Sequence, residues 1–173
     1  MVAQPVARQV LLITGSRALC DSPAAESWAR EILYETIRVL PPDAVVVAGD
    51  AGGPDHWGLH EAEIRDLYWT RFQLDGTRHD WRGLRKLRCV EWCSIDAVPE
   101  RGSPRWRRWP LERNRVMVAQ IAAVRAPIER SALALLAPWA STHGTAHTAM
   151  LLDQRGIVVR RETCPVGHAP FSH

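Results

Sequence analysis

The chain has 173 residues, of which 46% are hydrophobic and 24% are charged. This length and composition fit one globular domain with a sizeable core, and no apolar run approaches the ~20 residues needed to cross a membrane. The N-terminal residues lack a signal-peptide pattern, and the four cysteines are too few and too scattered for a disulfide scaffold. We therefore expect a cytoplasmic protein without membrane contact.

The formal net charge of +3 is unevenly distributed. Residues 71–115 carry twelve Lys and Arg against six Asp and Glu, and half of the eight tryptophans lie among them. A basic stretch interleaved with aromatic residues is compatible with a phosphate or nucleic-acid surface. We favour a solvated loop whose tryptophans pack onto the body of the protein, and treat residues 75–109 as a basic, Trp-rich insertion.

The first strand is expected at residues 10–14, which are all apolar or β-branched and therefore suit burial on both faces. It ends at Gly15, where the backbone can approach a ligand closely. Ser16 can donate a hydrogen bond, and Arg17 supplies a cationic fork suited to phosphate. The alternative is a tight turn followed by a solvated arginine.

A helix is predicted over residues 23–40, with Ser22 as its N-cap and Pro23 at its first position. A second buried strand follows at residues 44–48 and is closed by Gly49. A glycine loop over residues 49–55 then leads into a helix over residues 54–67, where Asp55 in the first turn complements the helix dipole. Residues 68–74 are expected to form a shorter strand nearer an edge of the sheet.

The second half of the chain shows weaker periodicity. Residues 81–93 are compatible with a helix, and residues 98–110 are predicted to be a loop, after which Trp109-Pro110 begins a helix. We expect a fourth buried strand at residues 131–137, a polar loop at 138–144, a helix at 145–155 capped by Gly156, and a fifth strand at 157–159. The tail from Arg160 onward carries no clear pattern.

Alternation of strands and helices at this spacing predicts an α/β fold, a Rossmann-like open parallel sheet of about five strands with helices on both faces. Right-handed crossovers would then bring three loops to one end of the sheet: residues 15–17, 49–55 and 141–145. Each combines small residues with the N-terminus of a helix, whose free N–H groups attract anions. The candidate ligand-binding residues in these loops are Gly15, Ser16, Arg17, Gly49, Gly52, Gly53, Asp55, Ser141, Thr142, His143, Gly144 and Thr145.

Four motifs in this order resemble the SLOG superfamily, in particular its small YspA-type members related to YpsA and to the DNA-processing protein DprA. They are Ile13-Thr-Gly-Ser-Arg17, Gly49…Gly52-Gly53-Pro54-Asp55, Glu112-Arg-Asn-Arg-Val-Met117 and His143-Gly-Thr-Ala-His147. The resemblance spans most of residues 10–160 and implies a single Rossmann-like domain over residues 1–173 that binds a nucleotide or a nucleotide-derived ligand. It also implies that Arg113 and Asn114 contact the ligand; the alternative for Arg113 is a surface cation.

The same superfamily includes LOG-type phosphoribohydrolases, which split the N-glycosidic bond of nucleoside monophosphates. Their catalytic Glu lies three positions after a Gly-Thr pair, where this chain has Thr148. A hydroxyl cannot replace a carboxylate in acid–base catalysis, so the departure speaks against hydrolysis. We therefore expect a sensor or carrier, with a nucleotide hydrolase and a single-stranded nucleic-acid binder as the alternatives.

Other polar residues have simpler interpretations. His143 and His147 are either ligand contacts or capping and packing residues, and His56 and His60 are expected at the surface. One further set of residues has the composition of a Cys₃His zinc site: Cys89, Cys93, Cys164 and His168. We favour free thiols over a zinc site for these cysteines. We expect no metal and no cofactor, and we expect the protein to form a homodimer.

Overall fold

The computed structural model describes residues 9–72, 79–80, 100–124, 126–141 and 143–170. Its sheet has the strand order β4-β3-β2-β1-β5-β6. Every neighbouring pair is parallel except β3 and β4, which are antiparallel. The strands are β1 (Gln9–Gly15), β2 (Val45–Gly49), β3 (Tyr68–Phe72), β4 (His79–Asp80), β5 (Glu129–Leu136) and β6 (Val158–Thr163). The predicted α/β fold with five parallel strands is therefore confirmed.

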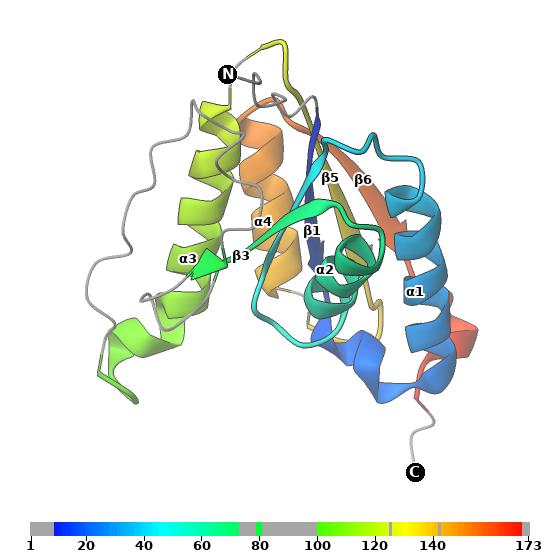
Figure 1. Cartoon of the computed structure of the whole chain (residues 1–173). Coiled ribbons are helices and arrows are strands. Elements are labelled where there is room, and N and C mark those ends of the chain that lie inside the picture. Colours follow the sequence, from blue (N-terminus) through cyan, green and yellow to red (C-terminus); the bar gives the residue numbers. More distant parts are fainter. Residues whose placement is uncertain (1–8, 73–78, 81–99, 125, 142, 171–173) are drawn as a thin grey trace.

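Helices cover both faces of the sheet, as predicted (Figure 1). Helices α1 (Pro23–Ile37) and α2 (Pro54–Ile64) lie on one face, and α3 (Pro104–Ala123) and α4 (His143–Gln154) lie on the other. Two short 3₁₀ helices, η1 (Arg17–Asp21) and η3 (Val166–His168), follow β1 and β6. Among the described residues, no helix combines the length and the apolar character that a membrane span requires.

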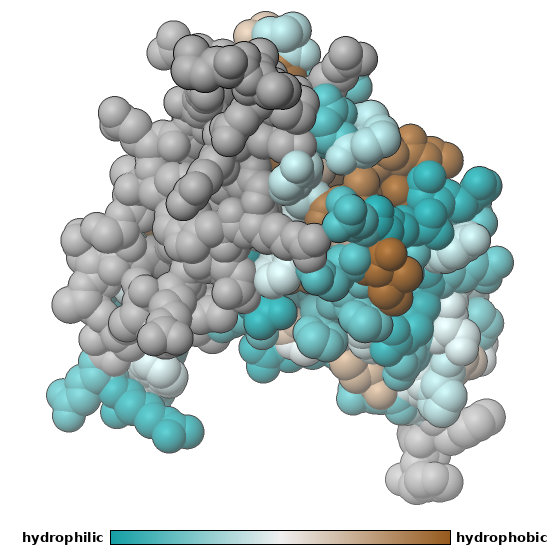
Figure 2. Space-filling view, in the orientation of Figure 1, coloured by the Kyte–Doolittle hydropathy of each residue, from teal (hydrophilic) through white to brown (hydrophobic). Residues whose placement is uncertain are grey.

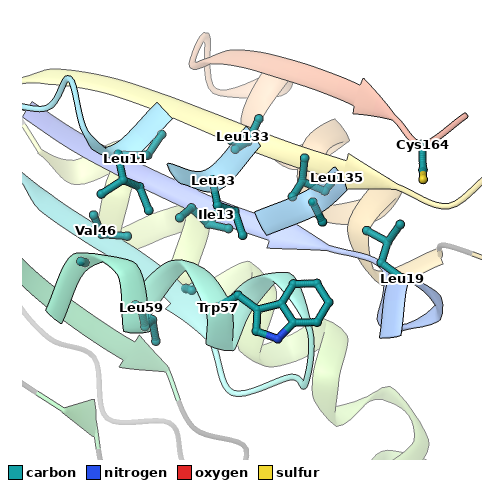
Figure 3. Packing of buried hydrophobic residues seen from close by; sticks show 14 of the residues in the cluster. Leu11, Ile13, Leu19, Leu33, Val46, Trp57, Leu59, Leu133, Leu135 and Cys164 are labelled. Carbon is teal, nitrogen blue, oxygen red and sulfur yellow. The ribbon is translucent and has the colours of Figure 1, made fainter. Parts of the chain in front are cut away.

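Alternate side chains of β1 enter two separate cores. Leu11 and Ile13 pack with residues of α1 and α2 such as Leu33 and Trp57 (Figure 3). Val10 and Leu12 join the core formed with α3 and α4. This two-sided burial explains why the strand is a continuous apolar run without polar alternation.

The helix boundaries follow local signals. Ser22 caps α1, because its Oγ accepts a hydrogen bond from the Ala25 amide at 3.4 Å. This helix ends at Ile37 and not at residue 40. Pro41 disfavours helical geometry at the residue before it, Leu40. Helix α2 ends at Ile64, three residues earlier than expected, and Asp66 then adopts a left-handed φ of 56°. Gly156 ends α4 with a φ of 68°, as predicted.

The start of α3 corrects the prediction of a loop over residues 98–110. The helix begins at Pro104, and Ser103 caps it by accepting a hydrogen bond from the Trp106 amide at 3.2 Å. Pro110 lies inside the helix instead of opening it. A proline in the second turn removes one backbone hydrogen bond, and the first turns bend away from the rest of α3 (Figure 1).

The other differences lie in the second half of the chain. Strand β6 continues to Thr163, although residues 160–162 are charged, because an edge strand can expose them. The tail then returns to the body: the Cys164 amide donates to the Leu136 carbonyl at 2.9 Å, and the Cys164 side chain is buried. Helix α4 begins at His143, two residues before the predicted start. The helix considered for residues 81–93 lies outside the described residues.

Candidate functional site

A cavity of about 350 Å³ lies at the carboxyl ends of β1 and β5. The connection after β1 leads to β2 on one side of the sheet, and the connection after β5 leads to β6 on the other side. β1 and β5 therefore flank the switch point of the sheet. Open parallel sheets bind ligands at such a point. The cavity is lined by Thr14, Gly15, Ser16, Arg17, Ala18, Ala51, Asp55, Pro110, Arg113, Asn114, Ser141, Gly144 and Thr145.

Most of the predicted ligand-binding residues meet in this cavity. Those that line it are Gly15, Ser16, Arg17, Asp55, Arg113, Asn114, Ser141, Gly144 and Thr145. Gly49, Gly52, Gly53 and His143 are not in its lining, and Thr142 lies outside the described residues. The sequence patterns did not identify four lining residues: Thr14, Ala18, Ala51 and Pro110.

One wall of the cavity consists of helix N-termini. Gly144 and Thr145 lie in the first turn of α4, which contains no acidic residue. In the same lining, Ser16 caps η1 by accepting a hydrogen bond from the Ala18 amide at 3.3 Å, and Arg17 is exposed beside it. First-turn amides, hydroxyls and a cation together favour an anionic group.

The other wall is built around Arg113, whose side chain is 6% exposed. Its Nη1 donates to Asp50 Oδ1 in an ion pair. Its Nε and Nη2 donate to Asn114 Oδ1 at 3.1 and 2.8 Å. The interpretation of Arg113 as a surface cation is therefore wrong, because the guanidinium is buried and held by two partners.

Gly49 supplies space for this wall. A Cβ at position 49 would stand 2.7 Å from Arg113 Cζ and 2.7 Å from Asp55 Oδ2. Gly15 has a similar role, since its Cβ would stand 2.4 Å from Pro54. Gly53 has a φ of 85°, which favours glycine in the turn before α2. Two of the predicted ligand glycines, Gly49 and Gly53, thus position neighbouring residues.

Asp55 departs from the expectation of an ordinary ionised residue at a helix N-terminus. It is 4% exposed, and its Oδ1 has no hydrogen-bond partner in the part of the chain that the structure describes. Burial raises the pKa of its carboxyl to about 7, against the opposing effects of Arg113 and of the Gly15 and Gly49 backbone; Asp50 contributes to the rise. A carboxyl with a pKa near neutrality in a cavity is a candidate for proton exchange in function.

Asp50 is the residue that sequence reasoning missed. It follows Gly49 directly at the carboxyl end of β2, and it orients Arg113 from 63 positions away. An acidic residue immediately after a buried strand was the available signal, because carboxyl ends of parallel strands face the ligand crevice.

Thr148, at the position where LOG-type enzymes have a catalytic Glu, does not face the cavity. It is fully buried, and its hydroxyl donates to the Gly144 carbonyl at 2.9 Å. It is not part of the cavity lining. The position that resembles a catalytic Glu therefore serves the internal packing of α4.

The described histidines and cysteines considered in the sequence analysis lie outside the cavity lining. His56 and His60 are exposed on α2, as expected, and His147 is half-buried on α4. Burial and the charge of Arg115 lower the pKa of His147. Cys164 Sγ and His168 Nδ1 lie 3.9 Å apart, whereas Cys89 and Cys93 lie outside the described residues. Within the described ranges, no cluster of three or more potential metal ligands is found.

The basic start of α3 projects from the rest of the helix as a hydrophilic surface (Figures 1 and 2). Arg107 and Arg108 are exposed there. Trp109 is 1% exposed and therefore packs into the body of the protein, with Arg105 Cζ 5.3 Å from its ring centroid. It cannot serve as a stacking platform for a nucleobase.

Comparison with protein-family models, with curated proteins and with solved structures finds no match to this chain.

Proposed function

We propose that the protein binds the phosphate of a nucleotide or nucleotide-derived ligand in this cavity, as a sensor or carrier. The observation that supports this most is the meeting of Ser16, Arg17, Gly144 and Thr145 at the switch point of the sheet. Arg17, Gly144 and Thr145 offer first-turn amides, Ser16 and Thr145 offer hydroxyls, and Arg17 adds an exposed cation. Membership of the SLOG superfamily, a cytoplasmic location and a homodimeric state belong to the same proposal.

The size of the cavity favours a small ligand. Binding pockets for small molecules range from roughly 300 to 1,000 Å³, and this cavity of about 350 Å³ lies near the lower limit. A single nucleotide unit is therefore favoured over a dinucleotide. Arg113 and Asn114 would hold the part of the ligand opposite the phosphate.

Binding without turnover is favoured over hydrolysis. The position that matches the catalytic Glu of LOG-type enzymes is occupied by Thr148, which is buried and bonded to Gly144. The predicted single-stranded nucleic-acid binder also loses support, because Trp109 is buried.

Calorimetry with nucleoside monophosphates and with the matching nucleosides tests the proposal. We expect heat of binding from the phosphorylated compounds only, and no free base after hours of incubation. Equal affinity for nucleoside and nucleotide would contradict phosphate recognition. Turnover at even ~1 s⁻¹, the low end for ordinary enzymes, would contradict a pure binding role.

Light scattering tests the proposed dimer. A mass near 19.4 kDa at micromolar concentration would show a monomer and remove this part of the proposal.

A further inference from the structure

Among the described residues that line the cavity, Asp55 is the one with a carboxyl group. We propose that Asp55 couples ligand binding to proton uptake, so that an anionic ligand enters the cavity together with one proton accepted by the Asp55 carboxylate. This inference rests on the proposed phosphate site. It adds that the protonation state of Asp55 determines how strongly this site binds an anion. The proton comes from solvent, and the carboxylate becomes a neutral carboxylic acid.

The geometry leaves Asp55 without a dedicated counter-charge. Arg113 is the cation that acts on Asp55, but its Nη1 is paired with Asp50, and its Nε and Nη2 are bonded to Asn114. Among the described residues, Asp55 Oδ1 has no hydrogen-bond partner, and Asp55 is 4% exposed. Solvent therefore cannot screen the carboxylate effectively when it is ionised.

The charged groups around Asp55 come from three elements. Helix α3 contributes Arg113, the turn after β2 contributes Asp50, and η1 contributes Arg17 at the edge of the cavity. β1 and β2 contribute the backbone of Gly15 and Gly49. In the described part of α4, the residues that line the cavity, Gly144 and Thr145, carry no ionisable side chain.

The charge balance of this group decides the sign of the coupling. With Asp55 ionised, the described group of Asp50, Asp55, Arg113 and Arg17 carries no net charge, whereas protonation of Asp55 gives this group a net positive charge that favours an anion. A dianion in the cavity shares the low-dielectric surroundings of Asp55, which lines the same cavity, so an ionised Asp55 opposes its binding. Since burial already brings the pKa of Asp55 to about 7, a bound anion raises this pKa further.

The expected pH dependence has one direction. Below about pH 7, Asp55 is already protonated in the free protein and binding takes up no proton through it. Above pH 7, the carboxylate must first be protonated, so affinity falls by up to about tenfold per pH unit until the pKa of the bound state is reached.

Inorganic sulfate is a suitable probe, because its charge does not change between pH 6 and 9. Its affinity for the intact protein is measured by calorimetry across this range at constant ionic strength. At pH 8, the titration is repeated in two buffers of different ionisation enthalpy, which gives the number of protons taken up. A nucleoside monophosphate, fully dianionic above about pH 7.5, is titrated in parallel.

The variant Asp55→Asn keeps the shape of the side chain and removes its charge. We expect it to bind sulfate at pH 8 about tenfold more tightly than the wild type, with no proton uptake and a flat pH profile. Asp153→Asn removes an exposed carboxylate from the far end of α4 and should retain the wild-type profile.

The outcomes separate the two proposals. Binding of the nucleotide or sulfate with constant affinity from pH 6 to 9, and without proton uptake, overturns the role of Asp55 and leaves the phosphate site intact. Failure of both anions to bind at any pH contradicts the proposed function itself. If Asp55→Asn does not fold, the two-buffer measurement on the wild type decides the question alone.

Discussion

The guanidinium of Arg113 occupies the space that a side chain at position 49 would need. A Cβ on Gly49 would stand 2.7 Å from Arg113 Cζ, a distance that real Cβ atoms essentially never show. Asp50, the next residue after Gly49, forms the ion pair with the same guanidinium. Two adjacent residues at the end of β2 therefore position a side chain from α3, one by leaving room and the other by charge.

The first prediction concerns Gly49→Ala. The added methyl group must displace Arg113 and Asp55, so we expect a loss of about 1–3 kcal/mol of folding free energy, the usual cost of overpacking, together with weaker ligand binding. Urea unfolding and calorimetry measure the two effects. Gly52→Ala is the matched control, because no described residue lies within 4 Å of a Cβ at that position. Equal behaviour of the two variants would contradict the packing role of Gly49.

Arg17→Ala tests the anion-binding wall. Arg17 is exposed and lines the cavity, so its removal should leave stability within about 0.5 kcal/mol of the wild type. Loss of a charge-assisted hydrogen bond to the ligand should weaken binding by about 1.5 kcal/mol, roughly tenfold. Calorimetry checks this. Unchanged affinity for every nucleotide that stabilises the wild type would show that Arg17 is only a surface residue.

Asp55 should make the protein less stable as the pH rises. Its pKa is raised from 3.8 to about 7, so between these values the folded state holds a proton that the unfolded state releases. The free energy of unfolding therefore falls across this window and is flat above it. At 1.36 kcal/mol per pKa unit the loss from this group reaches about 4 kcal/mol.

Urea unfolding of the wild type and of Asp55→Asn at pH 4 and pH 8 measures this contribution. The variant should lose much less stability than the wild type between the two pH values, and Asp153→Asn should behave like the wild type. Parallel pH profiles for all three proteins would mean that Asp55 ionises as freely in the folded state as in the unfolded state.

Thr148→Glu is expected to disrupt folding. The side chain is fully buried, so the longer carboxylate has neither room nor a counter-charge among its described contacts. We expect a loss of at least about 3 kcal/mol, measured by thermal or urea unfolding. Thr148→Ser retains the hydroxyl that bonds Gly144 and should cost about 1 kcal/mol. A stable Thr148→Glu protein that releases free base would reverse this conclusion.

The sequence predicted the five parallel strands and the end of the sheet that carries the cavity, but it did not predict β4. The apolar runs at β1, β2 and β5 had to be strands buried on both faces, and the small-residue turns after them had to share one edge. The resemblance further selected Arg113 and Asn114, which do line the cavity with Ser16 and Thr145.

Features that depend on tertiary contacts could not be predicted from local patterns. The burial of Thr148 and the perturbed Asp55 carboxyl arise where α4 and α2 pack against the sheet, which periodicity does not describe. The start of α3 was missed because Pro110 was interpreted as the first helical position, although Ser103-Pro104 repeats the Ser-Pro start of α1. The contact with Arg113 identified Asp50 as part of the site.

The most direct test of the phosphate site is an amide chemical-shift titration of the isotope-labelled protein with a nucleoside monophosphate. We predict that the largest shifts are those of Ser16, Arg17, Gly144 and Thr145, and that the matching nucleoside leaves them smaller or absent. Saturable binding whose largest shifts lie away from these four amides, or no shift at any of them at millimolar nucleotide, would contradict the account.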